Sequence, residues 1–114
     1  MLRTNLTHVL SEVDHAELLK NNENVMICCG RMGPMCIPVY EVMEELEGEY
    51  KNVKFADMEF DSPDAKVIRN LPECRSFQGL PFVVYYKNGQ VVKATSSIQS
   101  QDQVTAILDE KFGK

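Results

Sequence analysis

The stretch GLPFVVYYKNGQVV, Gly79 to Val92, carries the clearest structural signals in the sequence. Its centre, Pro81 to Lys87, is rich in β-branched and aromatic residues, which are typical of a buried strand. Asn88-Gly89 favours a two-residue hairpin turn, because both residue types tolerate positive φ angles. Val91 to Ala94 then returns as the antiparallel partner. The segment therefore predicts a β-hairpin.

Upstream of this hairpin, helical and extended patterns alternate along the chain. The periodicity predicts helices at 7–20, 35–49, 62–70 and 100–112, and strands at 25–29 and 53–60, in addition to the two hairpin strands. Pro38 is tolerated only in a first helical turn, which places the start of the second helix near Met35 or Cys36. This order predicts an α/β fold with a mixed central sheet of about four strands and helices on both faces.

Length and charge limit the classes of function. A chain of 114 residues suits a single domain, 1–114. The net charge of −5 argues against nucleic acid or an anionic membrane as the main partner, because both attract basic surfaces. The N-terminal stretch contains acidic residues and lacks the apolar core of a signal peptide, and no apolar run approaches the ~20 residues of a membrane helix. We therefore expect a cytoplasmic protein.

Three of the four cysteines lie in one short segment, CCGRMGPMC, Cys28 to Cys36. In a cytoplasmic domain such clustering favours redox, catalytic or metal chemistry over structural disulfides. Cys36 falls in the first turn of the predicted helix, where unpaired N–H groups and the helix dipole stabilise a thiolate. Arg31 adds a positive charge to the same loop. Cys36 is therefore the candidate reactive thiol.

A relocated redox pair, Cys29 with Cys36, is the sharpest hypothesis for this segment. Cys29 ends the predicted strand and Cys36 starts the helix, so the loop between them brings the two ends together. Cys29 would then be the resolving partner of Cys36, or the two roles would be reversed. Cys28 points to the opposite face of the strand, where a buried free cysteine behaves as a small apolar side chain. Cys74, seven residues before Pro81, is a possible additional thiol, with an ordinary loop cysteine as the simpler alternative.

The order of elements, with a cysteine site between the first buried strand and the next helix, resembles the thioredoxin family. GLPFVVYYKNGQVV is similar to the family's Gly-Ile-Pro-Thr, strand, Lys-Asn-Gly and return strand. The resemblance covers nearly the whole chain and implies a thioredoxin-like fold. It also implies that Pro81 is the family's cis-proline and that the backbone of Leu80 is offered to a substrate strand.

The resemblance breaks at the active site. The family pattern is Trp-Cys-Gly-Pro-Cys, whereas this chain has no tryptophan and no C-x-x-C. Aligning on Gly33-Pro34 places Met32 and Met35 at the two cysteine positions. Aligning on the apolar stripe of the following helix instead places Gly33 at the nucleophile position and Cys36 at the resolving position. We prefer the second register, because it needs no gap between the site and the end of the helix.

Three classes of function follow from these features. The first is a thiol–disulfide oxidoreductase of the protein-disulfide reductase type, which needs no cofactor; its partners would be a protein disulfide or peptide segment and a thioredoxin-reductase-like protein. The second is a redox-inactive binding module that keeps the peptide groove, with candidate residues Met32, Gly33, Pro34, Met35, Leu80 and Pro81. The third is a soft-metal or iron–sulfur protein, which the divergent side chains of Cys28 and Cys29 argue against.

Overall fold

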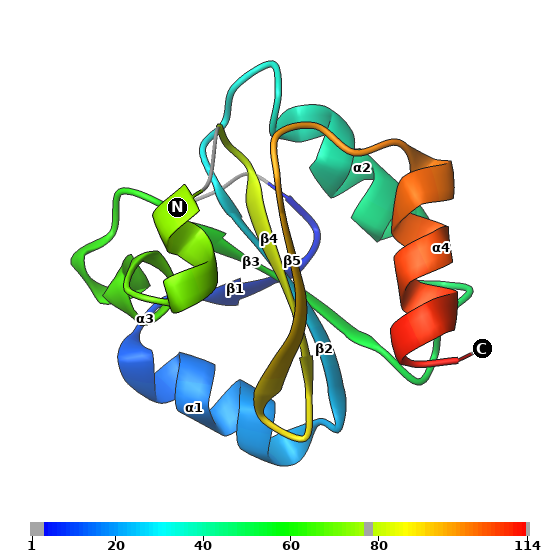
Figure 1. Ribbon diagram of the computed structural model, residues 1–114, viewed down its shortest axis with the longest axis horizontal. Coiled ribbons are helices and arrows are strands. Elements are labelled where there is room, and N and C mark those ends of the chain that lie inside the picture. The colour runs from blue at the N-terminus through cyan, green and yellow to red at the C-terminus, as the bar shows by residue number, and fades with distance from the viewer. Residues whose placement is uncertain (1–3, 77–78, 114) are drawn as a thin grey trace.

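A five-stranded mixed sheet forms the centre of the computed structural model, which describes residues 4–76 and 79–113 (Figure 1). The strands are β1 (Thr7–Val9), β2 (Asn24–Gly30), β3 (Lys54–Glu59), β4 (Phe82–Lys87) and β5 (Gln90–Ser96), in the spatial order β1-β3-β2-β4-β5. Strands β1 and β2 run parallel to β3, whereas β4 is antiparallel to β2 and to β5. The predicted mixed sheet is confirmed, with one strand more than the four expected.

Helices cover both faces of this sheet, as the sequence predicts. The helices are α1 (Glu12–Asn21), α2 (Ile37–Leu46), α3 (Lys66–Arg69) and α4 (Gln101–Lys111), with short 3₁₀ turns at Pro63–Ala65 and Pro72–Ser76. Figure 1 shows α2 and α4 on one side of the sheet and α1 and α3 on the other. No helix within the described ranges is long and apolar enough to cross a membrane.

The N-terminal helix predicted at 7–20 is wrong in its first part. Thr7–Val9 is strand β1, whose backbone pairs with β3 along one edge of the sheet. The helix begins only at Glu12, where the hydroxyl of Ser11 accepts a hydrogen bond from the N–H of Asp14. The apolar residues of the predicted helix at 7–20 do not form one buried stripe, because Val9 is buried but Val13 is 64% exposed. Pairing with β3 therefore overrides a weak helical pattern.

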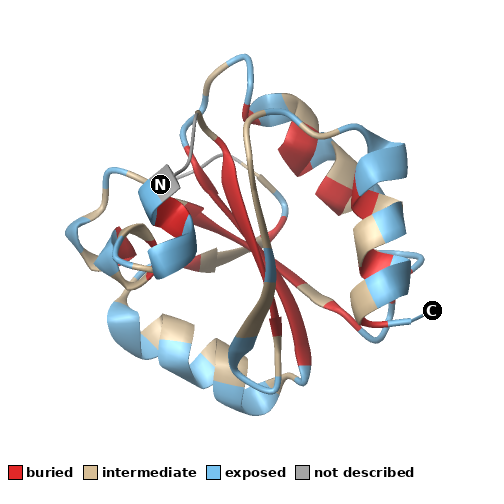
Figure 2. Ribbon diagram, viewed as in Figure 1, coloured by how far each residue is buried: buried red, intermediate tan, exposed pale blue. Residues whose placement is uncertain are grey.

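The hairpin predicted from Asn88-Gly89 is confirmed. Both residues have positive φ angles, 54° and 80°, and the turn joins β4 to β5. The inner strands are the most buried part of the molecule, as the red ribbons of Figure 2 show.

Strand β2 lies in the middle of the sheet and all seven of its residues are buried. Because side chains alternate along a strand, β2 contributes to two separate cores. Cys28 belongs to the core beneath α2 and α4, and Cys29 to the core beneath α1 and α3. This alternation decides which cysteine lies near the start of α2.

Candidate functional site at the start of helix α2

Cys36 is the N-cap residue of α2, which agrees with the helix start predicted from Pro38. The backbone N–H groups of Cys36 and Ile37 both donate to the carbonyl of Gly33, over 3.1 and 3.0 Å, and this turn leads the loop into the helix. The Sγ of Cys36 accepts a hydrogen bond from the backbone N–H of Arg31 at 3.4 Å. The thiol therefore has a backbone N–H donor. The residue itself is almost fully buried, with 3% of its surface exposed.

Three segments of the chain meet around Gly30: the end of β2, the start of α2 and the residues before β4. A Cβ atom on Gly30 would lie 2.8 Å from Cys36 Sγ, 2.9 Å from the hydroxyl oxygen of Tyr40 and 3.3 Å from Cβ of Pro81. The Leu80–Pro81 peptide bond is cis. Cys36 and Pro81, which lie 45 positions apart in the sequence, are thus at one corner of the molecule.

An exposed apolar rim surrounds this corner. Met32, Met35 and Ile37 are 41%, 43% and 37% exposed, respectively. Of the other residues expected to bind substrate, Pro34 is exposed, Gly33 and Leu80 are half-buried and Pro81 is buried. The predicted groove residues therefore include side chains that a partner can reach. Methionine is common on such surfaces because its flexible thioether adapts to different shapes.

The structure does not bring Cys29 and Cys36 together in one core. Cys36 lies in the core beneath α2 with Cys28, whereas Cys29 shares the opposite core with Cys74. The expectation that Cys28 faces away from Cys29 is confirmed, but the helix start lies on the Cys28 side. Sequence position alone could not decide this, because a shift of one residue along a strand reverses its faces.

Burial raises the pKa of three cysteine thiols, Cys28, Cys29 and Cys74. Cys28 and Cys29 are fully buried, and this desolvation raises the pKa of Cys28 well above its usual value and the pKa of Cys29 to about 12. Burial also raises the pKa of Cys74, against the opposing charge of Arg69. These three thiols are therefore poorly suited to make the first attack on an external disulfide.

Asp57 is a buried acid beside this site that the sequence analysis did not single out. It lies in β3 directly opposite Cys28 in the strand register and is 1% exposed. Its carboxylate contacts Nδ1 of His8 at 2.7 Å and accepts a hydrogen bond from the hydroxyl of Thr4. Burial raises its pKa, although these two hydrogen bonds act in the opposite direction. The sequence carried one sign of this buried acid: Asp57 stands at a core-facing position of the predicted strand VKFADMEF.

The guanidinium of Arg31, the positive charge of this loop, is paired with Asp61. It forms a two-pronged ion pair with Asp61, with N···O distances of 2.8 and 2.9 Å, and lies 5.7 Å from the ring centroid of Phe60. Arg31 lowers the pKa of Asp61 through this pairing. The side chain therefore anchors the loop, while the backbone N–H of the same residue serves the thiol.

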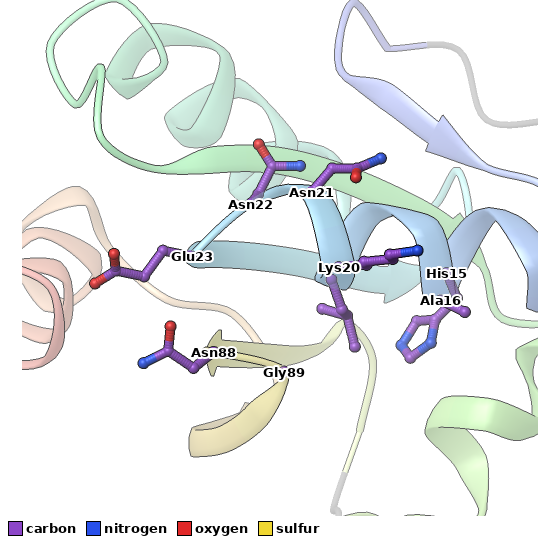
Figure 3. Close-up of a pocket in the computed structure, with 9 residues that line it drawn as sticks. His15, Ala16, Lys20, Asn21, Asn22, Glu23, Asn88 and Gly89 are labelled. Atoms are coloured by element: carbon purple, nitrogen blue, oxygen red, sulfur yellow. The ribbon is translucent and has the colours of Figure 1, made fainter.

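A surface hollow lies elsewhere, between the end of α1 and the β4–β5 turn (Figure 3). His15, Lys20, Glu23 and Asn88 are among its lining residues, and Nε2 of His15 is 3.1 Å from the hydroxyl of Tyr86. No cysteine lines it. Across residues 4–76 and 79–113, no group of three or more His, Cys, Asp or Glu side chains is arranged to hold a metal ion.

Comparison with solved structures places this architecture among the thioredoxins. Thioredoxin f2 of Chlamydomonas reinhardtii superimposes with a TM-score of 0.79 at 14% identity, covering 96% of this chain and 99% of that one. Plasmodium falciparum thioredoxin gives 0.77 at 18% identity, covering 93% and 99%. Mitochondrial thioredoxin 3 of Saccharomyces cerevisiae gives 0.72 at 22% identity, covering 91% and 94%.

The chain therefore has the thioredoxin fold, as its resemblance implied. No protein-family model matches the sequence, and no curated protein matches it. In this chain the loop between β2 and α2 exposes Met32 and Met35 and ends in a single cysteine, Cys36.

Proposed function

We propose that the chain is a thioredoxin-like thiol–disulfide oxidoreductase in which Cys36 reacts with a partner disulfide. One observation carries this proposal: the Sγ of Cys36 lies at the start of α2, accepts the N–H of Arg31 and lies beside Gly30 and Pro81. Helix starts and N–H donors favour the thiolate form of cysteine. Thioredoxins as structural neighbours agree with redox chemistry at this corner.

The reaction has two steps. The Cys36 thiolate attacks one sulfur of the partner disulfide, forming a mixed disulfide and releasing the other partner sulfur, which takes up a proton. A second thiol of the chain then attacks Cys36 Sγ and releases the partner in its reduced form. The sequence offers Cys29 as a candidate for this second role, and a map of the oxidised protein tests it.

The partner proposed for this site is a protein disulfide or an extended peptide segment. Met32 and Met35, both exposed, would supply apolar contacts at the rim, and the backbone of Leu80, beside Pro81, would pair with an extended chain. A thioredoxin-reductase-like protein would restore the thiols. The reaction needs no bound cofactor, because the two cysteines carry both electrons. A reducing compartment such as the cytoplasm suits this cycle.

A redox-inactive binding module is the second candidate. It is favoured by the exposure of Met32 and Met35 at the two positions where alignment on Gly-Pro expects cysteines, and by the burial of Cys36 beneath them. On this hypothesis the groove binds a peptide, and Cys36 is a packing residue.

A glutathione redox titration separates the two candidates. The purified protein is equilibrated at defined glutathione ratios, free thiols are alkylated, and the intact mass gives the number that reacted. The oxidoreductase predicts a reversible loss of two alkylatable thiols, including Cys36, near the range of thioredoxins and glutaredoxins (~ −200 to −270 mV). If the Cys36 thiol is free to alkylate at every glutathione ratio, the protein is not an oxidoreductase, and the binding module becomes the preferred function.

A further inference from the structure

The four cysteines are divided equally between the two faces of the sheet. Cys28 and Cys36 share the core beneath α2, while Cys29 and Cys74 share the core beneath α1 and α3. A disulfide between Cys29 and Cys36 would have to pass through the central strand. Building on the proposed function, we propose that Cys28, and not Cys29, is the thiol that closes the disulfide with Cys36.

Gly30 locates Cys36 relative to Cys28. Gly30 follows Cys28 by two residues on β2, so a Cβ on either residue points to the same face. Cys36 Sγ lies 2.8 Å from the Cβ position of Gly30, and two strand residues span ~6.6 Å. A disulfide needs a Cβ–Cβ distance of about 3.5–4.5 Å. Cys28 and Cys36 therefore lie on the same face of β2 within one core, and Gly30, which is next to Cys36 Sγ, carries no side chain. Closing the disulfide requires the two Cβ atoms to approach to this distance.

The electrostatic environment of each thiol agrees with this grouping. Among the charges that raise the pKa of Cys28, that of Cys36 acts more strongly than that of Cys29, its neighbour in the chain. For Cys29 the leading charge is instead Cys74, and Cys36 acts less strongly. Because charge interactions weaken with distance, each thiol is influenced most by the cysteine on its own face.

Burial also assigns the order of the two steps. Cys28 lies on β2 and has no exposed surface, whereas Cys36 is 3% exposed at the start of α2, so an external disulfide reaches Cys36 first. Cys36 attacks first and holds the partner as a mixed disulfide. The Cys28 sulfur then bonds to Cys36 Sγ, the bond from Cys36 to the partner breaks, and the Cys28 proton ends on the released partner thiol. The chain loses two electrons and two protons, and the partner disulfide gains them.

Differential labelling of the oxidised protein tests this pairing. The protein is oxidised with glutathione disulfide and unfolded in acid. Its free thiols are blocked with light N-ethylmaleimide, and those released by reduction are labelled with the heavy reagent. Fragment ions that break the chain between Cys28 and Cys29 read the two labels separately. We expect heavy label on Cys28 and Cys36 and light label on Cys29 and Cys74.

Other label patterns overturn the proposal in distinguishable ways. Heavy label on Cys29 and Cys36 would refute the Cys28 pairing and leave the oxidoreductase intact. Heavy label on Cys36 without a second cysteine, with retained glutathione, would show that no intrachain partner exists. Light label on Cys36 at every glutathione ratio would refute both the pairing and the proposed function.

Two adjacent variants provide a matched comparison, because both positions are fully buried and each loses only a sulfur atom. Cys28→Ala should stop at the Cys36–glutathione mixed disulfide, whereas Cys29→Ala should close and lose two alkylatable thiols, as the wild type does. The reverse pattern would overturn the inference. Circular dichroism establishes that each variant is folded, and the wild-type label map decides the question if either variant does not fold.

Discussion

The hydroxyl of Tyr40 donates a 3.1 Å hydrogen bond to the backbone carbonyl of Arg31. This bond ties the first full turn of α2 to the residue whose N–H donates to Cys36 Sγ. The carbonyl of Arg31 therefore binds Tyr40, and its N–H binds Cys36, the N-cap residue of the same helix. The position of the thiol and the position of the loop are therefore linked through one backbone unit.

Tyr40→Phe tests this link. Losing the hydroxyl leaves the Arg31 carbonyl without this donor, and we expect unfolding free energy to fall by about 0.5–1.5 kcal/mol. The loop is held less firmly, so alkylation of Cys36 in the native protein should become faster. Tyr50→Phe is the control, since that hydroxyl binds Asp109 away from the thiol. Equal alkylation rates in wild type and Tyr40→Phe would show that the bond does not control access.

Gly30→Ala should be destabilising because the added methyl has no room. It would lie 2.8 Å from Cys36 Sγ and 2.9 Å from the Tyr40 hydroxyl oxygen, both inside van der Waals contact. Crowding of this kind costs about 1–3 kcal/mol, measured by urea unfolding. Gly33→Ala is the matched control, because nothing lies within 4 Å of its Cβ position. A Gly30→Ala variant as stable as Gly33→Ala would contradict the described packing.

Asp57 should make stability increase on mild acidification. Burial raises its pKa in the folded protein above the unfolded value of about 3.9. Between these two values the folded state binds more protons, so the free energy of unfolding falls as pH rises. Relative to Asp57→Asn, the wild type should therefore gain stability as pH drops from 7 towards 4.

Urea unfolding at several pH values in that range measures this difference, with Glu41→Gln, an exposed acid on α2, as the baseline. A difference between wild type and Asp57→Asn that stays constant or shrinks on acidification would show that Asp57 does not titrate in this way.

His15 should act in the opposite direction. Desolvation by burial lowers its pKa in the folded protein below the unfolded value of about 6.5. Between these values the unfolded state binds more protons, so stability is lost as pH falls through about 6.5. His15→Gln should remove this loss, as measured by thermal or urea unfolding between pH 7.5 and 5.

Tyr86→Phe separates the two features of the His15 environment. This variant removes the hydroxyl 3.1 Å from Nε2 but keeps the aromatic ring against the imidazole. The acid loss should persist in it, because burial is the cause of the lowered pKa. An acid loss that disappears with the hydroxyl would instead assign the effect to the hydrogen bond.

The sequence by itself determined the local features of this protein. Asn88-Gly89 specified the hairpin because few residue types adopt positive φ angles without strain, and Pro38 fixed the start of α2 because proline fits only a first helical turn. The position of Cys36 at a helix start followed from these rules. The resemblance of GLPFVVYYKNGQVV then indicated the fold, which the structural comparisons confirmed.

Only the tertiary structure decided which side chains share a face. Thr7–Val9 became a strand because β3 offered an edge to pair with, and Asp57 became a neighbour of Cys28 through the β2–β3 register. The packing of α2 against the Cys28 face of β2 placed Cys36 with Cys28 rather than Cys29. Strand faces reverse with every residue, so a cysteine's partner depends on how strands and helices pack across the whole chain, which local sequence patterns do not encode.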